Sequence, residues 1–389
     1  MKKILIHLLK PLSFLPAILM MYLIYSFSAQ TGEVSGALSY EVSYQIVETK
    51  NEVLNENKTE TELAYSASSI EFYVRKAARY LVWRDSGGQV SCCYKERTME
   101  TRRKKTGMSL ADHIFIDMCK DVIENGTSTE GEKVRPVWED GTSAYTIKRF
   151  GVVNRYDLRK EFPALTLRKT ALKSAMDEIL WIWQKKSNNI HDLHSHIWDS
   201  WADENGSIGK AYGYQLGVKH QYKEGMMDQV DRVLYDLKNN PYSRRIMTNI
   251  YVHEDLHEMN LYPCAYSMTF NVTKEPGKDK LTLNAILNQR SQDILAANNW
   301  NVCQYSLLLM MIAQCCDMEA GELVHVIADC HIYDRHVPVI KELISRTPYP
   351  APTVKLNPNV KNFYDFTTDD LIVENYQTWP QIKNIPIAI

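Results

Sequence analysis

The chain has 389 residues, of which 45% are hydrophobic and 24% charged, a globular balance that allows two or three domains. Its formal net charge of −2 excludes a protein that binds nucleic acid mainly through bulk positive charge. The eight cysteines form no C-x-x-C pair, so they indicate reduced thiols of a cytosolic protein rather than a structural zinc site.

The N-terminal segment departs from this cytosolic pattern. Lys2, Lys3 and Lys10 precede an uncharged run over 11–29, about as long as a helix needs to span a bilayer. We therefore expect one hydrophobic N-terminal helix, either a transmembrane anchor or a signal peptide cleaved near Ala29. A buried helix of a globular protein is disfavoured, because no polar face interrupts the run.

The chain that follows is polar and amphipathic up to residue 80. Its motifs "FSAQTG" at 27–32 and "EFYVRKAA" at 71–78 resemble the start of VanZ-like membrane proteins. The resemblance covers 1–80, but Arg79 stands where that family has a histidine, and no further span follows. Residues 81–107 are basic and lack periodicity, so we expect an unstructured junction there.

From residue 108 onward, helix-like and strand-like patterns alternate. Apolar spacing predicts an amphipathic helix that begins after Met108 and ends at Asn125-Gly126. The remaining patterns predict largely buried helices and several strands, with helices at 173–186 and 301–316 and strands at 243–252, 266–272, 280–291 and 322–333. With a hairpin turn at 275–278, this mixture predicts an α+β fold with a large sheet.

Two chemical signals compete in "HEDLHEMNLYPCAYSMTF". His253, Glu254 and His257 spell the H-E-x-x-H of zinc proteases, which requires a helix of several turns. A β-branched segment precedes the motif, and Asn260 and Pro263 follow closely, so a short surface helix or turn between two strands is favoured. A membrane-anchored zinc protease is the alternative.

The second signal is Cys264, which lies behind a proline and ahead of a strand. A nucleophilic thiolate needs nearby cations, for which the chain offers Arg244, Arg245 and Arg290. In a Cys–His hydrolase, His331 or His336 could act as the base.

The other cysteines of this region lie in more ordinary surroundings. Those in apolar helical segments are expected to be buried hydrophobic residues: Cys119, Cys303, Cys315 and Cys316. Cys330, between Asp329 and His331, is open to either reading.

Six motifs now stand in one order: "DEILWIWQ", "HIWDSWADENGSIGKAYGYQLG", "NNPYSRRIMTN", "NLYPCAYSMTF", "LNQRSQDILAANNWNVCQY" and "IADCHIYDRH". Together with the C-terminus they resemble folate-dependent thymidylate synthases over 108–389, and Met108 is a candidate start. The resemblance implies a large mixed sheet with packed helices in a cytoplasmic homodimer. It also implies reductive methylation of dUMP to dTMP, with 5,10-methylenetetrahydrofolate as carbon and hydride donor, and no metal.

The resemblance assigns the chemistry to a few positions. Cys264 matches the nucleophile that adds to the uracil ring, and Glu178 matches a glutamate that handles protons through ordered water. Tyr212 matches the tyrosine of the proton-abstraction network, and Arg290 and Asn301 complete the catalytic set. From the residues alone, Glu178 could instead be a solvated carboxylate paired with Lys173 or Lys185.

The same resemblance implies the ligand-binding residues. The dUMP set comprises Arg135, Arg290 and Ser291 for the phosphate, Arg244 and Arg245 for the phosphate across the dimer interface, Asn301 for the uracil edge, His331 and Tyr333 for the ribose 3′-hydroxyl, with Gln289 and Asp293. The folate set comprises Asp293, Trp198, Trp201 and Ala388 of the closing C-terminal flap. An asparagine at 301 favours dUMP over dCMP.

Four positions depart from the pattern of the family: Ala265, Ala297, Ala171 and Arg168. They indicate a divergent branch and bear on folate contacts and rates. A membrane-associated VanZ-like protein with a passenger C-terminal domain is a further alternative. However, one span with Lys2 and Lys3 in the cytoplasm would export 108–389, away from dUMP and reduced folate. We therefore expect residues 1–80 to be a truncated remnant joined in frame to a complete enzyme.

Overall fold

The computed structural model describes residues 43–45, 47–48, 51, 59, 63, 108–382 and 384–388. The chain divides into two units, Met1–Thr98 and Met99–Ile389. The expected hydrophobic helix at 11–29, the VanZ-like motifs and the junction at 81–107 lie outside the described residues. Among the residues that are described, no helix is long and apolar enough to cross a membrane.

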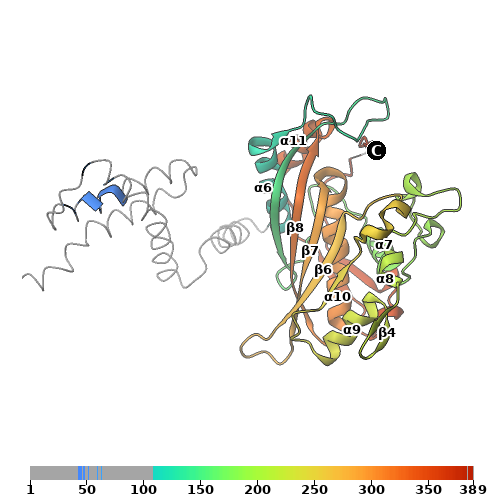
Figure 1. The fold of residues 1–389 in the computed structure, drawn as a ribbon. Helices are drawn as coiled ribbons and strands as arrows, with labels where there is room; N and C mark the ends of the chain where they lie inside the picture. The colour runs from blue at the N-terminus through green and yellow to red at the C-terminus, as the bar shows by residue number, and fades with distance from the viewer. Residues whose placement is uncertain are drawn as a thin grey trace, which may run out of the picture. The chain divides into compact units, whose positions relative to one another are not determined.

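A six-stranded mixed sheet forms the centre of the second unit (Figure 1). Its strands, in spatial order, are β1 (Thr127–Ser128), β2 (Thr146–Asp157), β8 (Glu319–Tyr333), β7 (Thr282–Asp293), β6 (Ala265–Thr273) and β5 (Met247–Asn249). Only β7 and β8 are parallel, and all other neighbours are antiparallel. The prediction of an α+β fold with a large mixed sheet is confirmed.

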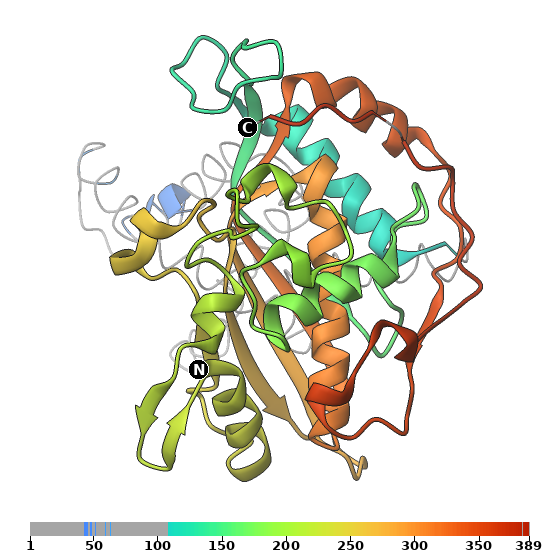
Figure 2. The ribbon, with the colours of Figure 1, turned by 90° about the vertical axis from the view of Figure 1, so that its right-hand side faces the viewer.

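Helices cover one face of this sheet. Its helices are α6 (Leu110–Asn125), α7 (Leu172–Trp183), α8 (Gly213–Gly217), α9 (Gln229–Asn239), α10 (Asn299–Cys315) and α11 (Val337–Ser345). Figure 2 shows α10 and α6 side by side in front of the sheet. Because α10 is apolar on nearly all sides, it is buried almost along its whole length between the sheet and α7.

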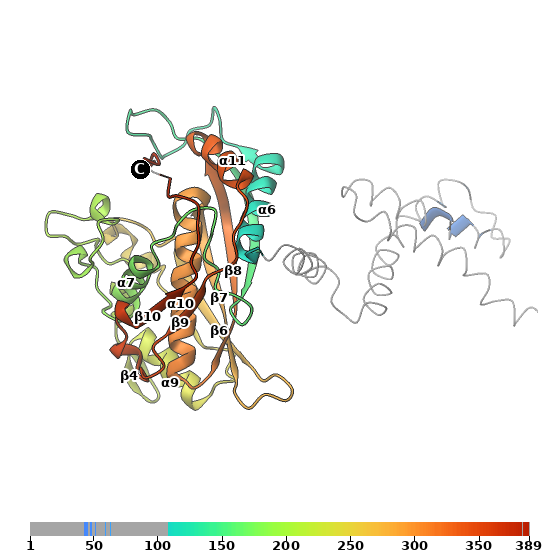
Figure 3. The same cartoon turned by 180° about the vertical axis from the view of Figure 1, so that it is seen from behind.

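Smaller elements complete the fold. Two short antiparallel pairs are β3–β4 (His220–Tyr222, Gly225–Met227) and β9–β10 (Thr353–Leu356, Leu371–Glu374). The β9–β10 pair contributes Leu356 and Leu371 to the main hydrophobic core. The view from behind in Figure 3 shows this pair beside α10. A π-helical turn, η5 (Ile294–Asn298), connects the end of β7 directly to α10.

The predicted helices and the strands β6, β7 and β8 are confirmed, as is the turn at 275–278, where Lys278 N–H donates to Glu275 O. The strand expected at 243–252 is shorter, because β5 is an edge strand that pairs with β6 only over Met247–Asn249. No strand was expected at β2, because its basic residues obscure the alternation of polar and apolar side chains. Two of them, Lys148 and Arg149, form ion pairs with Asp329 and Asp121.

The opposite face of the sheet exposes apolar side chains. Directly paired residues point to the same face, and Met247 and Ile286 both pair with Thr269 there. Val153 pairs with Val326 in the next row of this face. Val153, Ile286 and Met247 are 54%, 38% and 50% exposed, respectively. We call this surface the open face of the sheet.

Candidate active site

The polar residues gather at one edge of the sheet. Because β7 and β8 are parallel, their carboxyl ends lie at the same edge, and the antiparallel β6 begins there. This places Cys264, just before β6, beside Arg290 near the end of β7, whose N–H donates to Cys264 O at 2.9 Å. His331 and Tyr333 lie at the end of β8, at the same edge.

The Cys264 thiol lies beside a guanidinium group. Arg290 Nη2 is 3.6 Å from Cys264 Sγ. Two further bonds, from Arg290 Nε to Pro263 O at 2.9 Å and from Nη2 to Tyr262 O at 2.7 Å, hold the guanidinium in place. Burial raises the pKa of the Cys264 thiol, whereas the positive charge of Arg290 opposes this rise. The pair therefore stabilises the thiolate that a nucleophile requires.

Tyr212 positions the backbone of the nucleophile. Cys264 N–H donates to the Tyr212 hydroxyl at 3.0 Å. Tyr212 has a φ of 45°, a conformation that costs free energy and is found at functional sites. The adjoining Gly213 permits this turn, because an added Cβ there would lie 2.3 Å from Ser187 O. The Tyr212 ring packs edge-on against Trp198 at 5.0 Å.

Glu178 is a buried carboxylate on α7. Trp300 Nε1 donates to its Oε2 at 2.7 Å. Burial raises the pKa of Glu178 to about 7, although the Trp300 hydrogen bond lowers it in part. The alternative of a solvated pair with Lys173 or Lys185 is wrong, because Lys173 pairs with Asp369 and Lys185 donates to a backbone carbonyl.

Asn301 lies in the first turn of α10 with its amide bonded on both sides. Gln289 Nε2 donates to Asn301 Oδ1 at 3.0 Å, and Asn301 Nδ2 donates to Gln304 Oε1 at 3.0 Å. Gln304 was not singled out from the sequence. Its only signal was a glutamine inside an otherwise apolar helix, which needs a polar partner when it is buried.

Asp293 links the start of α10 to the C-terminal segment. Its Oδ1 accepts from Leu295 N and Ala296 N at 2.9 and 3.1 Å and lies 3.5 Å from His336 Nδ1. Burial raises the pKa of Asp293, but the interactions with His336 more than offset this and lower it overall. His336 Nε2 is 2.7 Å from Pro386 O, close to the half-buried Ala388. The sequence indicated His336 only as a candidate base and did not predict the tether that it forms between Asp293 and Pro386.

Aromatic rings form two groups around these residues. Tyr333 packs edge-on against Trp138 at 5.5 Å and His331 at 5.1 Å, and His331 Nδ1 is 2.8 Å from Asp329 Oδ1. Trp198 contacts Trp201 at 5.9 Å between ring centres, so the two indoles expected together do pack together. From the sequence, no site role was assigned to Trp138.

The three remaining arginines are exposed. Arg135 lies close enough to Cys264 and Tyr333 for its charge to lower the pKa of both groups. Arg244 and Arg245 directly precede Ile246 and β5. Neither guanidinium forms a hydrogen bond or an ion pair within the part of the chain that the structure describes.

Three of the other thiols are buried as expected, and Cys316 is only partly so. Cys119, Cys303 and Cys315 are buried and Cys316 half-buried, and burial raises the pKa of each. Cys330, left open by the sequence, is also buried, with its pKa raised to about 12.

Comparison with known proteins decides the family. The family model described as thymidylate synthase matches residues 113–388.

The chain belongs to the thymidylate synthase family.

Individual relatives agree with the family model. The chain is 44% identical over 275 residues to the thymidylate synthase of Bacillus subtilis subsp. natto, covering 69% of this chain and 96% of the relative. The thymidylate synthase of Bacillus phage phi3T is 43% identical over the same length. A solved structure, thermostable thymidylate synthase A from Bacillus subtilis, is similar at a TM-score of 0.67 and 40% identity, covering 72% of this chain and 99% of that one.

As a thymidylate synthase, the enzyme is a methyltransferase that converts dUMP to dTMP. Methylenetetrahydrofolate is the co-substrate that supplies the carbon and the hydride, and dihydrofolate is the by-product. The predictions of the activity and the co-substrate are confirmed.

The zinc-protease alternative for this thymidylate synthase is wrong. His253 to Glu258 form a short exposed 3₁₀ helix, η4 (His253–Glu258), between β5 and β6, as expected for a surface connection. With three residues per turn, His253 and His257 point about 120° apart. Within the described ranges, no group of three or more metal-ligating side chains occurs.

The four departures from the family pattern have ordinary structural roles. Ala265 is buried at the start of β6, and Ala171 precedes α7 without a side-chain cap. Arg168 is buried and donates to Leu295 O. Ala297 lies within the π-helical turn η5.

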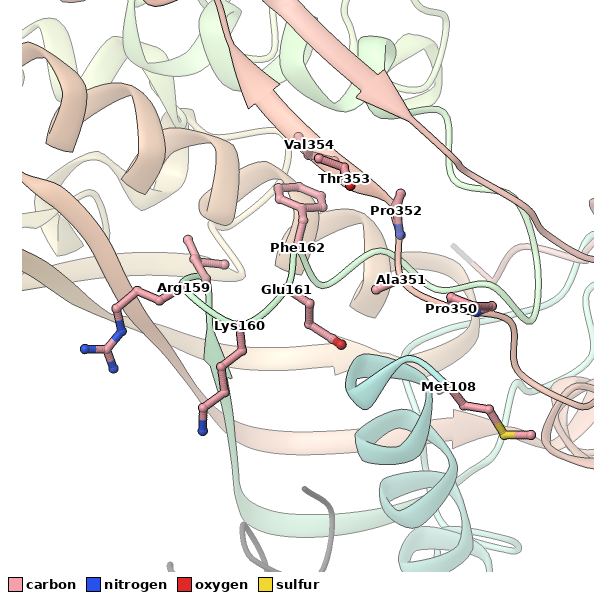
Figure 4. Close-up of a pocket in the computed structure, with 11 residues that line it drawn as sticks. Met108, Arg159, Lys160, Glu161, Phe162, Pro350, Ala351, Pro352, Thr353 and Val354 are labelled. Atoms are coloured by element: carbon pink, nitrogen blue, oxygen red, sulfur yellow. The ribbon is translucent and has the colours of Figure 1, made fainter. Parts of the chain in front are cut away.

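A pocket elsewhere on this thymidylate synthase is shown in Figure 4. It is bounded by the chain segments 158–162 and 350–354, with Met108 at one side. None of the residues assigned to nucleotide or folate binding lines it. Its Arg159 is held by Asp157 and Glu275.

Proposed function

We propose that Cys264 is the nucleophile of this enzyme. Its thiolate adds to C6 of the uracil ring, and the enolate that forms attacks the folate methylene carbon through C5. The observation that carries the proposal is the 3.6 Å contact between Arg290 Nη2 and Cys264 Sγ.

Proton transfer falls to Glu178 and Tyr212. A carboxyl group with a pKa of about 7 can both accept and donate a proton near neutral pH, as a general acid–base group must. Tyr212 belongs to the same site because its hydroxyl accepts from Cys264 N–H. Asn301 binds the uracil edge, since an amide can accept from N3–H and donate to O4.

The nucleotide phosphate and sugar bind beside the nucleophile. Arg290, Ser291 and Arg135 are the phosphate ligands of one subunit, because a planar guanidinium matches phosphate oxygens. The Nη1 group of Arg290 takes no part in the contacts to Cys264 and the preceding loop, which leaves donors for phosphate. His331, Tyr333, Gln289 and Asp293 complete the dUMP site at the same strand ends.

Folate binds between the indoles and the C-terminal segment. Trp198 and Trp201 supply an apolar wall, and Asp293 supplies a carboxylate for the pterin ring. Ala388 belongs to a flap that closes over the folate and excludes water. The tether from Asp293 through His336 to Pro386 supports this assignment, because it joins the pterin-binding residue to the flap.

The working enzyme is a homodimer formed through the open face of the sheet. Exposed Val153, Ile286 and Met247 favour burial against an equally apolar surface, and a second copy of this chain supplies one. Arg244 and Arg245 lie just before Met247 in the chain and are exposed. They bind the phosphate in the site of the other subunit.

We propose that residues 108–389 form the enzyme domain and act in the cytoplasm, where dUMP and reduced folate are found. Residues 1–80 are a truncated VanZ-like remnant joined through 81–107. N-terminal sequencing of the native protein tests this organisation, with a mature start near Met108 as the expected result. A start near Met1 in an active membrane fraction would contradict it.

The nucleophile is tested by trapping. Fluoro-dUMP with methylenetetrahydrofolate should give a covalent ternary adduct, detected by mass spectrometry on the peptide that contains Cys264. Cys264→Ala should lose both the adduct and turnover, whereas Cys316→Ala, a matched change at a half-buried thiol, should keep both. An adduct on any other residue would overturn the assignment.

A further inference from the structure

A fully buried histidine lies behind the asparagine proposed to bind uracil. His325 is on β8 and has no exposed surface. Its Nε2 is 2.5 Å from Oε1 of the buried Gln289 on the neighbouring parallel strand β7. The family resemblance did not single out His325, and the proposed chemistry does not use it.

This contact fixes the proton on the His325 ring. An amide oxygen can only accept a hydrogen bond, so the ring nitrogen that faces it must carry the hydrogen. Burial lowers the pKa of His325 to about 3, so the ring is neutral and holds one hydrogen, on Nε2. In the part of the chain that the structure describes, Nδ1 has no hydrogen-bond partner.

The direction of one bond then determines the next. With its oxygen held by His325, Gln289 can present only its NH₂ group to Asn301, and Gln289 Nε2 donates to Asn301 Oδ1 at 3.0 Å. Gln304 Oε1 accepts from Asn301 Nδ2 on the other side at 3.0 Å. The three hydrogen bonds from His325 through Gln289 and Asn301 to Gln304 therefore all have the same donor-to-acceptor direction.

The orientation of the Asn301 amide distinguishes the two pyrimidines. Asn301 Oδ1 keeps a lone pair for the N3–H of uracil, and Nδ2 keeps one N–H for O4. Cytosine presents an acceptor at N3 and an amino group at C4, so it would require the reversed amide. A reversed Asn301 would set its own NH₂ group against the NH₂ group of Gln289 and its oxygen against Oε1 of Gln304.

We propose that His325 is a positioning residue that fixes the amide of Asn301, through Gln289, in the orientation that accepts uracil and rejects cytosine. The inference rests on the proposed role of Asn301 as the residue that contacts the base. His325 itself touches neither substrate nor folate. It therefore determines specificity without taking part in the chemical step.

The test compares nucleotide discrimination in variants of the full chain. His325→Phe keeps a buried ring without the Nε2 donor, and His325→Gln restores an N–H donor at a similar reach. The measured quantity is the inhibition constant for dCMP divided by the KM for dUMP. We expect His325→Phe to lower this ratio by about tenfold, because Asn301 is then free to turn. His325→Gln should restore most of it.

The outcomes separate this role from a merely structural one. A structural histidine would lower the melting temperature, or kcat for dUMP, without changing the ratio. An unchanged ratio in folded His325→Phe would overturn the proposal. If that variant does not fold, Gln289→Met removes the partner of His325 in the same hydrogen bond. An unchanged ratio in Gln289→Met would likewise overturn the proposal.

The test of His325 can be told apart from the test of Cys264 as the nucleophile. If wild-type enzyme forms no fluoro-dUMP adduct on Cys264, the proposed function fails whatever the ratio. If the adduct forms and the ratio is insensitive to His325 and Gln289, only the specificity role fails.

Discussion

The indole Nε1 of Trp300 donates to Glu178 Oε2 at 2.7 Å and joins the helix that carries Asn301 to the helix that carries the buried carboxylate. The donor stabilises the charged form of a group whose pKa burial has raised to about 7. Burial thus raises the pKa of Glu178, and Trp300 opposes that rise and increases the ionised fraction near neutral pH.

Trp300→Phe should raise the pKa of Glu178 further, because it removes a donor to the carboxylate and keeps the ring. We expect the limb of the pH–kcat profile that reports Glu178 to move up by about one pH unit. Trp379→Phe, which removes an indole donor bonded to Thr347 O, is the matched control and should leave the limb in place. An unmoved limb in Trp300→Phe would show that this hydrogen bond does not tune the carboxylate.

Glu178→Gln should inactivate the enzyme and stabilise its fold at alkaline pH. The folded-state pKa of about 7 lies above the ordinary value of 4.5, so burial of Glu178 costs the folded protein increasing stability as pH rises from 4.5 to about 7, and the cost stays constant above that pH. Above that pH the variant should gain up to about 3 kcal/mol of unfolding free energy, and the gain should vanish below pH 4.5. Urea unfolding of both proteins across the pH range measures it. A gain that is the same at every pH would contradict the linkage.

Arg290→Gln should slow alkylation of Cys264 by iodoacetamide at neutral pH by about tenfold, because the thiolate loses its nearby cation. The pH dependence of alkylation at this cysteine, read by peptide mass spectrometry, is the measurement. Arg149→Gln removes a half-buried arginine that pairs with Asp121 on the surface, and it should leave the rate unchanged. Equal rates in both variants would remove Arg290 from the activation of the thiol.

Val153→Asp should shift the enzyme toward monomers and lower its activity, because it places a charge on the open face of the sheet. Analytical ultracentrifugation gives the oligomeric state. Val373→Asp introduces the same change at an exposed valine of β10 and should leave sedimentation unaltered. A Val153→Asp dimer with full activity would place the interface elsewhere.

Mixing two inactive variants should restore activity if an arginine crosses the interface. Cys264→Ala lacks the nucleophile and Arg245→Gln lacks the donated guanidinium, so a mixed dimer contains one intact site. After subunit exchange, an equal mixture should reach roughly a quarter of the wild-type rate. Recovery no greater than the sum of the two separate variants would mean that Arg245 acts within its own subunit.

Much of this architecture could be predicted from the sequence where a local pattern carries it. The apolar run of α10 and the alternation of β7 placed Asn301 and Arg290 on the correct elements. β2 was missed because ion pairs with residues far along the chain, such as Lys148 with Asp329, put charges in the middle of a strand.

The supporting residues could not be predicted for the same physical reason. Trp300 and Glu178 are 122 positions apart, and His325 and Gln289 are 36 apart. A histidine in an apolar strand shows neither its partner nor its tautomer until the fold brings the amide to it. The family resemblance assigns the groups proposed to contact ligands but not the groups behind them.

The π-helical turn η5 has a consequence for any attempt to transplant this site. Such a turn spans i to i+5 bonds, so it holds one residue more than the α-helical turn it replaces. Removing that residue would rotate the start of α10 by about 100° and carry Trp300 and Asn301 out of register with the sheet. The end of α10 that carries Asn301 can thus be transplanted only together with the strand-to-helix junction that sets its rotation. Single-residue insertions or deletions at 294–298 should be tolerated far less well than substitutions.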